Sequence, residues 1–501
     1  MKILLFCHLG QIPEFAEYIN ALKKVSSIQT LFLTMGREEY KRGQEVGVFD
    51  VVKDVLPKQS ELDASDKEAS RIAQALSELE ERIGSNFVYR DIMMDRFFTG
   101  PPRLDVDPNK VPLIWAGSRA KHFMYLFYKQ LEKEITSFEP DFIFIETHLA
   151  PNRMIWRLAR EKGIPAGRFS PVRFWPERLY LETEIGYEWH QVRTAYSEMP
   201  NRPMKGAELA KVKQRLQTIL DEKTKPVYMQ SDHAKGAPDI LKRLHPAQLF
   251  TQFNSWLGAR ARSSTTNPQI LPSKVFSPIS KVIRYRDGMK AKRYLLQNQI
   301  PFEQIQGKKY AIYFLHVQPE LTVEGMAFDY RDQVNTLNNI LASLPADMYL
   351  VVKEHTPMLG FRPLAIYKHL VRIPGIIIAE THEDSHNLIT HASTVITLTG
   401  TVALEAVLYG IPAIVLGSIY FEGFNGVYKP ENLDELRQLL SDPNKLAGAT
   451  KDDALRALGS MLRASDPGSP PRVDPTKLQE IDLESARVML SKLEMLDGGY
   501  L

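Results

Sequence analysis

Residues 394–416 constrain the fold of this chain more than any other stretch. The β-branched run Thr394–Leu398 is followed by the turn Thr399-Gly400-Thr401 and by a helical pattern that ends at Gly410. A second apolar run, Pro412–Leu416, comes next. This order predicts two parallel strands joined by a helix, which is the unit from which doubly wound α/β sheets are built.

The same stretch offers a place for a phosphate. A turn of small residues between a strand and a helix leaves backbone N–H groups at the positive end of the helix, which favours an anion. Glu405 lies about one turn into this helix, where its carboxylate could accept hydrogen bonds from ribose hydroxyls. An ordinary strand–helix–strand unit with an exposed glutamate fits the stretch equally well, because no phosphate motif of high specificity is present.

Composition sets bounds on the whole chain. Its 501 residues exceed one typical core, so we expect two or three domains. A hydrophobic content of 44% and a charged content of 25% are typical of a soluble globular protein, and the net charge of +3 argues neither for nor against nucleic acid. The single cysteine, Cys7, excludes a disulfide framework and a multi-cysteine metal site, and it suits a reducing compartment.

The apolar N-terminal run Lys2–Cys7 predicts a buried strand. It is too short for a signal peptide and lacks a small-residue cleavage site. No segment reaches the ~20 apolar residues that span a bilayer. We therefore expect a cytoplasmic protein, and peripheral contact with the inner face of the cytoplasmic membrane stays open.

Apolar runs and helical patterns alternate over residues 1–200, which predicts an N-terminal Rossmann-like domain. The strand after Pro140 ends in Glu146 and His148, at the edge where open parallel sheets bind ligands. The other expected strands are Lys2–Cys7, Gln29–Leu33 and Ile164–Phe169, and the expected helices are Ile12–Lys24, Pro57–Arg82, Ser118–Ser137 and Asn152–Lys162.

A second Rossmann-like domain is expected over residues 306–464. Its strands are Tyr310–His316, Met348–Lys353, Gly375–Ala379, Thr394–Leu398 and Pro412–Leu416, and its helices include Asp332–Leu344, Pro363–Leu370 and Glu383–His391. Two such domains that face a central cleft predict a GT-B-like α/β fold, the architecture of many glycosyltransferases.

Two further segments complete the expected organisation. Residues 201–305 are rich in Lys and Arg and lack strand signals, which predicts a solvated helical insertion; a basic face for an anionic glycan or lipid surface is the alternative. Residues 465–501 predict a linker and a C-terminal helix, Lys477–Leu496, that packs back across the domains.

Polar side chains follow three strands of the second domain, and they predict a nucleotide site. The first strand ends in His316-Val317-Gln318, the second in Lys353-Glu354-His355, and the fourth in Thr399-Gly400-Thr401 with Glu405 behind it. Lys353 or His355 could neutralise a phosphate, and Glu405 could hold a ribose. A single polar strand end is usually a solvated loop, but three on one edge of a sheet favour a binding site.

These segments resemble the capsule and surface polysaccharide biosynthesis family, whose best-understood members are bacterial retaining β-Kdo (3-deoxy-D-manno-oct-2-ulosonic acid) glycosyltransferases. The motifs that carry the resemblance are His316–Glu320, Asp332-Gln333, Val352–Gly360 and Thr399–Ala406 in the second domain, and Ser170–Pro176 and Tyr180–Glu182 in the first. Thr356 separates His355 from Pro357, where the family has His-Pro.

The resemblance implies a CMP-Kdo donor. Cytidine monophosphate would be bound by Gln318, Lys353, His355, Thr399, Gly400, Thr401 and Glu405. Family members retain the anomeric configuration, which implies a carboxylate nucleophile and a second group that handles protons. We assign Asp232, beside His233 and Lys235, as the nucleophile and Glu146 as the acid–base residue; a helix cap or turn is the structural alternative for Asp232.

Kdo carries a carboxylate, so the site should supply a cation. Arg153 and Arg173 are the candidates, because a guanidinium can bind a carboxylate in a bidentate manner; either could also form a surface ion pair. No cofactor and no metal are expected, because no Asp-x-Asp signature stands at an expected strand end and a CMP-sugar leaves a single phosphate.

The expected partners are the nucleotide-sugar donor and a lipid-linked or oligosaccharide acceptor, with no nucleic acid. Contact with the inner membrane or with other polysaccharide-assembly enzymes stays open. Two other classes of protein fit the same layout: a UDP-sugar epimerase, which would select UDP and need no acceptor, and a non-catalytic glycan-binding protein, which would bind no nucleotide.

Overall fold

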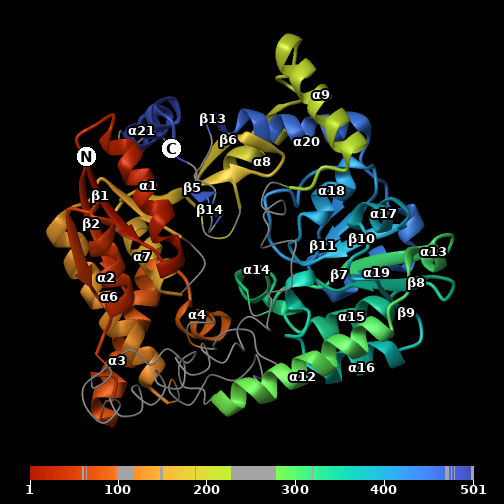
Figure 1. The fold of residues 1–501 in the computed structure, drawn as a ribbon, viewed down its shortest axis with the longest axis horizontal. Coiled ribbons are helices and arrows are strands. Elements are labelled where there is room, and N and C mark those ends of the chain that lie inside the picture. Colours follow the sequence, from red (N-terminus) through yellow and green to blue (C-terminus); the bar gives the residue numbers. More distant parts are fainter. Residues whose placement is uncertain are drawn as a thin grey trace.

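The computed structural model describes most of the chain, in two α/β domains (Figure 1). The described residues are those outside 59–60, 64, 96–97, 99–114, 116, 147–149, 185, 187, 227–277, 319, 469–472, 475–476, 479 and 498–501. No helix in this described part is long and apolar enough to cross a membrane.

A seven-stranded sheet forms the first domain, with the order β13-β6-β5-β4-β1-β2-β3. Strands β5, β4, β1, β2 and β3 are parallel neighbours, whereas β6 runs antiparallel to β5 and β13 antiparallel to β6. The bounds are β1 Lys2–Phe6, β2 Gln29–Thr34, β3 Val51–Asp54, β4 Phe142–Ile145, β5 Ala166–Val172, β6 Trp175–Glu182 and β13 Asp466–Pro467.

Helices cover both faces of this sheet, because side chains along β1 alternate between two cores. Leu4 and Phe6 pack with α3, α6 and α7, and Ile3 and Leu5 pack with α1 and α21. The helix bounds are α1 Ile12–Lys23, α2 Arg37–Val46, α3 Asp66–Ile83, α4 Val88–Met94, α6 Arg119–Phe138, α7 Ala150–Glu161 and α21 Leu483–Asp497.

The second domain contains a six-stranded sheet whose strands are all parallel, in the order β12-β11-β10-β7-β8-β9. Its strands are β7 Tyr310–Phe314, β8 Tyr349–Lys353, β9 Ile376–Ala379, β10 Thr394–Thr397, β11 Ala413–Val415 and β12 Val427–Tyr428. Its helices are α13 Phe302–Ile305, α14 Leu321–Glu324, α15 Gln333–Leu341, α16 Leu364–Arg372, α17 Ser385–Thr390, α18 Val402–Leu408, α19 Leu433–Ser441 and α20 Lys451–Arg463.

The predicted fold class is confirmed: two Rossmann-like sheets form a GT-B-like α/β architecture. The predicted helical insertion contains α9 (Gly206–Glu222) and α12 (Pro278–Gln297), which lies against α16 on the outside of the second domain (Figure 1). Between these helices, the basic segments at 241–245 and 260–262 lie outside the described residues.

Aromatic side chains join the two domains. The ring of Trp189, just before α8 (His190–Glu198), stacks on Tyr180 of β6 and on Tyr420 of the second domain, with centroid distances of 4.6 Å in both pairs. The indole of Trp175 donates a hydrogen bond to the carbonyl oxygen of Leu458 in α20, at 3.1 Å. These contacts bury the end of the first sheet against the helices of the second domain.

The C-terminal segment returns to the first domain. Strand β13 follows α20 and pairs with β6, and α21 packs against α1. The predicted helix start at Lys477 was wrong: residues 477–478 form the short strand β15, and α21 begins at Leu483. The physical reason is a local cap, since Asp482 accepts a hydrogen bond from the backbone N–H of Ser485 at 2.7 Å.

Strand β6 was not predicted. Its sequence, Trp175–Glu182, mixes charged and aromatic residues and contains Pro176, so it lacks the apolar pattern of a parallel core strand. It is nevertheless well packed because it pairs closely with β5, where Gly167 lies beside the backbone of Glu182.

This close approach predicts that Gly167→Ala destabilises the protein. A Cβ atom at position 167 would overlap the carbonyl oxygen of Glu182, and overpacking of this kind costs about 1–3 kcal/mol. Urea denaturation should show a lower midpoint for Gly167→Ala than for the wild type. The matched control is Gly423→Ala, because a Cβ atom there meets no atom within 4 Å; equal midpoints for the two variants would contradict the packing described for β5 and β6.

Candidate functional site

Three neighbouring strand ends line one pocket between the domains. Strand β7 lies between β10 and β8, so the residues that follow these strands meet at one edge of the sheet. The pocket has a volume of about 540 Å³. From the second domain it is lined by His316, Glu320, Thr322, Lys353, His355, Ser385, Thr397, Thr399, Gly400, Thr401 and Glu405, among others. The prediction that the three strand ends share one edge is confirmed.

The turn after β10 is held by side chains from two strands. The hydroxyl of Thr397 accepts a hydrogen bond from the backbone N–H of Gly400 at 3.0 Å and shares another with Nε2 of His316 at 3.1 Å. Position 400 has no room for a side chain, since a Cβ atom would lie 2.5 Å from the Thr397 hydroxyl. Burial lowers the pKa of His316 to about 3, so its imidazole is neutral in this network.

Lys353 brings an ammonium group and His355 an imidazole to the end of β8. The Lys353 ammonium donates a hydrogen bond to the carbonyl oxygen of Thr381 at 2.8 Å, and its side chain is largely buried. Burial lowers the pKa of Lys353 to about 8, and burial also lowers the pKa of His355. An anion that enters the pocket would favour the charged form of both groups.

Glu405 is held from behind by a buried histidine. Nε2 of His386 lies 3.3 Å from a carboxylate oxygen of Glu405, and Nδ1 of the same ring lies 3.2 Å from Asp384. His386 is 1% exposed, and it comes from α17, the helix next to α18. The ring therefore packs behind the Glu405 carboxylate at the pocket wall, although neither ring nitrogen forms a hydrogen bond with a described residue.

A buried ion pair supports the strand ends from below. Glu354 accepts hydrogen bonds from Nε and Nη2 of Arg362, at 2.7 and 3.1 Å, and from the hydroxyl of Tyr367 at 2.7 Å. Nη2 of Arg362 also donates to the carbonyl oxygen of His316 at 2.9 Å. The pair thus links the end of β7 to the end of β8.

Gln318 does not line the pocket. Its amide nitrogen donates to Glu324 at 2.8 Å and to the carbonyl oxygen of Arg331 at 2.7 Å, while its amide oxygen accepts from Gln333 at 3.1 Å. Gln333 in turn accepts from the backbone N–H of His316 at 2.8 Å. Gln318 therefore supports the loop that carries His316, in contrast to the direct nucleotide contact that we predicted for it.

The first domain closes the pocket with two arginines. Arg168 and Ser170 lie in β5 and Arg173 follows it. Arg173 lies over the ring of Trp189, with 5.6 Å between the guanidinium carbon and the ring centroid. Arg168 is held in place by Glu146 at 2.8 Å and by Glu182 at 3.2 Å.

Two further residues that we predicted for the site are not among the residues that line this pocket. Glu146 is 5% exposed and lies behind Arg168, outside the pocket lining. Arg153 is also outside this lining: it is 2% exposed, pairs with Asp91 at 2.9 Å, and lines a neighbouring pocket. Asp232 lies outside the described residues.

Sequence reasoning missed several residues of the pocket wall. Arg168 and Trp189 lie at the unpredicted β5–β6 pair and just before α8, and His386 lies in α17, behind Glu405. Arg168 had a detectable signal, since it alternates with buried residues at the end of a predicted strand. His386 had none in the sequence, because its role depends on a contact between two helices.

One comparison with known proteins covers the part of the chain that carries the three strand ends. A family model described as capsule polysaccharide biosynthesis protein matches residues 278–457, which contain all three strand ends. Residues 278–457 match the capsule polysaccharide biosynthesis family. The resemblance predicted from the motifs of the second domain is confirmed over this part of the chain. A search of curated proteins finds no match.

Several solved structures are weakly similar to this chain. The β-Kdo 2,4 transferase KpsC of Thermosulfurimonas dismutans is 11% identical over 64% of this chain and 79% of its own, with a TM-score of 0.35. A β-Kdo 2,7 transferase KpsC of the same organism is 11% identical over 73% and 89%, with a TM-score of 0.34. The UDP-GlcNAc 2-epimerase of Neisseria meningitidis is 11% identical over 92% and 98%, with a TM-score of 0.24. TM-scores of this size add nothing to the family match.

The Glu354–Arg362 pair predicts a strong coupling between these residues. Glu354→Ala leaves a buried guanidinium without its carboxylate, which costs about 3–5 kcal/mol of unfolding free energy. The double variant Glu354→Leu/Arg362→Met removes both charges and should recover much of this loss. Urea denaturation of the single and double variants measures the coupling; losses that simply add would show that the two residues do not act as a pair.

Proposed function

We propose that this protein is a glycosyltransferase that moves Kdo from CMP-Kdo to a bacterial surface polysaccharide, an O-antigen or a capsule, with retention of configuration. The observation that carries the proposal is the pocket itself. Groups suited to a phosphate and a ribose gather on the capsule-family domain, and guanidinium groups face them from the first domain.

In this proposal the phosphate of CMP lies against the turn at 399–401 and the cationic end of β8. Gly400 permits close approach of the backbone, and Lys353 and His355 supply positive charge. Glu405 accepts hydrogen bonds from the ribose hydroxyls, with the ring of His386 behind its carboxylate. A single phosphate is neutralised by these groups, so the proposal needs no metal and no cofactor.

The sugar of the donor extends toward the first domain. Its carboxylate would be bound by Arg173, with Arg168 as the second cation of that wall. Glu146 and Glu182 hold the Arg168 side chain, so this guanidinium is oriented before the donor arrives. Arg153 lines a different pocket.

Retention follows from two displacements at the anomeric carbon. A carboxylate, which we assign to Asp232, forms a bond to this carbon while the bond to the CMP phosphate oxygen breaks. An acceptor hydroxyl then displaces the carboxylate and gives up its proton to a base. Glu146 is the acid–base residue of the sequence prediction, but it lies behind Arg168 outside the pocket lining, so Glu320, which lines the pocket, is the better placed group for this proton.

The nucleotide specificity of the pocket tests the proposal. A thermal-shift comparison of CMP, UDP and GDP should show stabilisation by CMP alone, which increases with ligand concentration. Glu405→Ala should abolish this shift, whereas the exposed control Glu431→Ala should keep it. Stabilisation by UDP in place of CMP would favour a UDP-sugar epimerase, and no shift with any nucleotide would favour a non-catalytic protein.

The nucleophile has a separate test. Asp232→Asn should abolish release of CMP from CMP-Kdo in the presence of acceptor, while the thermal shift with CMP persists, because the amide cannot form the covalent intermediate. Asp221→Asn in α9 is the matched control and should keep activity. Turnover by Asp232→Asn at the wild-type rate would remove the nucleophile from this assignment.

The lowered pKa of Lys353 predicts how CMP affinity depends on pH. Lys353 is charged below its pKa of about 8 and neutral above it, and a phosphate binds the charged form. Calorimetric titration with CMP should therefore show constant affinity from pH 7 to 7.5 and a fall of up to ~10-fold per pH unit above pH 8. Lys353→Arg should flatten this profile, because arginine stays charged. An unchanged profile in that variant would exclude Lys353 as the titrating group.

A further inference from the structure

A second pocket lies between the same two domains, beside the nucleotide pocket. It has a volume of about 350 Å³ and is walled by α4 and α7 on one side and by Leu321, Met326 and Ser418 on the other. Glu320, Thr322 and Ile419, the sequence neighbours of two of these residues, line the nucleotide pocket. The two pockets therefore adjoin each other at these two segments, as a donor site and an acceptor site must.

Four arginines and a tryptophan line this second pocket: Arg90, Arg153, Arg157, Arg160 and Trp156. The inner two are largely neutralised, since Arg153 and Arg157 both pair with Asp91. Nη2 of the buried Arg153 nevertheless has no hydrogen-bond acceptor in the described part of the chain, and its nearest carboxylate oxygen, on Asp95, is 3.6 Å away. A buried donor without an acceptor is costly, so a ligand that supplies one gains binding energy.

The outer two arginines are exposed and form no ion pair with any described residue. Nη2 of Arg90 donates to the carbonyl oxygen of Gly325 at 3.2 Å, which fixes the side chain across the domain boundary. Arg160 lies over the ring of Trp156, with the guanidinium carbon 5.4 Å from the centroid. Each keeps several N–H donors available, in the fork geometry that binds a carboxylate or a phosphate.

Carboxyl groups from the segment before α8 also line this pocket and suit sugar hydroxyls. Glu184 and Glu188 line the pocket together with His190, and burial raises the pKa of Glu184. Glu184 accepts hydrogen bonds from the backbone N–H groups of Thr183 and His190, both at 3.2 Å. A pocket lined by both carboxyl and guanidinium groups fits a ligand that has hydroxyls as well as an anionic group, and it fits a free inorganic anion less well.

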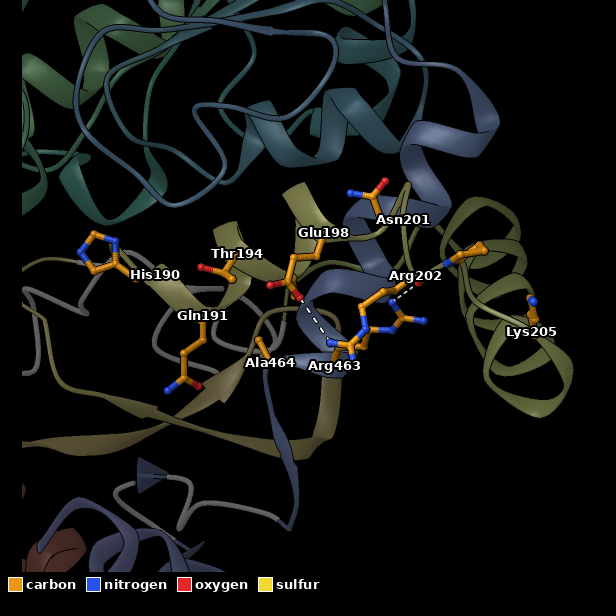
Figure 2. Close-up of a pocket in the computed structure, with 11 residues that line it drawn as sticks. His190, Gln191, Thr194, Glu198, Asn201, Arg202, Lys205, Arg463 and Ala464 are labelled. Carbon is orange, nitrogen blue, oxygen red and sulfur yellow. Dashed lines mark hydrogen bonds and ion pairs between the residues drawn. The ribbon is translucent and has the colours of Figure 1, made fainter. Parts of the chain in front are cut away.

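His190 also lines a third, outer pocket of about 800 Å³. Figure 2 shows this pocket along α8 and the end of α20, with Glu198, Arg202 and Arg463 at its far end. Glu198 pairs with Arg202 at 3.7 Å. Because one histidine belongs to both walls, a chain of several sugars could leave the second pocket past His190 and continue along α8.

We propose that the second pocket binds the acceptor glycan, and that Arg90 and Arg160 hold a carboxylate or phosphate on that glycan. The inference rests on the proposed glycosyltransferase function and names the chemical class of its acceptor. The outer pocket beyond His190 takes the following sugar units.

Direct binding of small glycosides tests the inference without turnover. The probes are methyl β-D-glucuronide for the carboxylate, glucose 6-phosphate for the phosphate, and methyl β-D-glucoside as the neutral sugar, each titrated by ligand-observed NMR. The wild type should bind one or both anionic probes at least tenfold more tightly than the neutral probe. Arg160→Ala and Arg90→Ala should each weaken anionic binding by about tenfold, while Arg71→Ala, an exposed arginine of α3, should leave it unchanged.

The thermal shift with CMP is measured on the same variants and should not change, because neither arginine lines the nucleotide pocket. Equal binding of anionic and neutral probes, no binding of any probe, or anionic binding that survives in both variants would overturn the acceptor site. Absence of a thermal shift with CMP in the wild type would instead contradict the proposed function. Failure of the acceptor site and failure of the proposed function are therefore distinguishable.

Discussion

The buried pair between Glu354 and Arg362 is the interaction on which the candidate site depends. Both side chains are removed from water, at 2% and 4% exposure, so their charges must be compensated within the protein. Arg362 also donates a hydrogen bond to the backbone carbonyl oxygen of His316, just after β7, so the pair connects two neighbouring strand ends. Lys353, His355 and His316 are therefore positioned by one network that lies beneath the pocket floor.

The second constraint is the junction between the domains. The pocket has walls from both sheets, so its shape depends on how β6 and α8 pack against α20 and the loop at Tyr420. The chain crosses back after α20 to place β13 beside β6, which ties the second domain to the first sheet at two points. The pocket floor from the second domain and the arginine-bearing wall from the first are thus held at a fixed spacing by aromatic packing.

Sequence reasoning predicted the second domain well, because its parallel strands are apolar runs of ordinary length and their polar ends are conspicuous. The turn at 399–401, Lys353 and His355 line the pocket for that reason. Gln318 stands at a similar strand end but turns away, because three hydrogen-bond partners in its own loop satisfy its amide. Residue type and position along a strand do not specify the direction of a side chain.

The wall from the first domain was harder to predict. Arg153 begins a helix after a strand, which suggested a ligand, but two aspartates from α4 and its end surround it. Arg168 lies at the candidate pocket because β5 pairs with the unpredicted strand β6, and Glu146 and Glu182 hold its guanidinium there. Contacts between residues far apart in the chain decided both cases, and periodicity carries no information about such contacts.

The central claim is that CMP binds where the ends of β10, β7 and β8 meet the arginines of the first domain. A crystal structure of the protein with CMP tests it most directly. The account predicts density for the phosphate at the 399–401 turn and beside Lys353, with the ribose at Glu405. Density for the nucleotide in another pocket, or a ribose that makes no contact with Glu405, would contradict it.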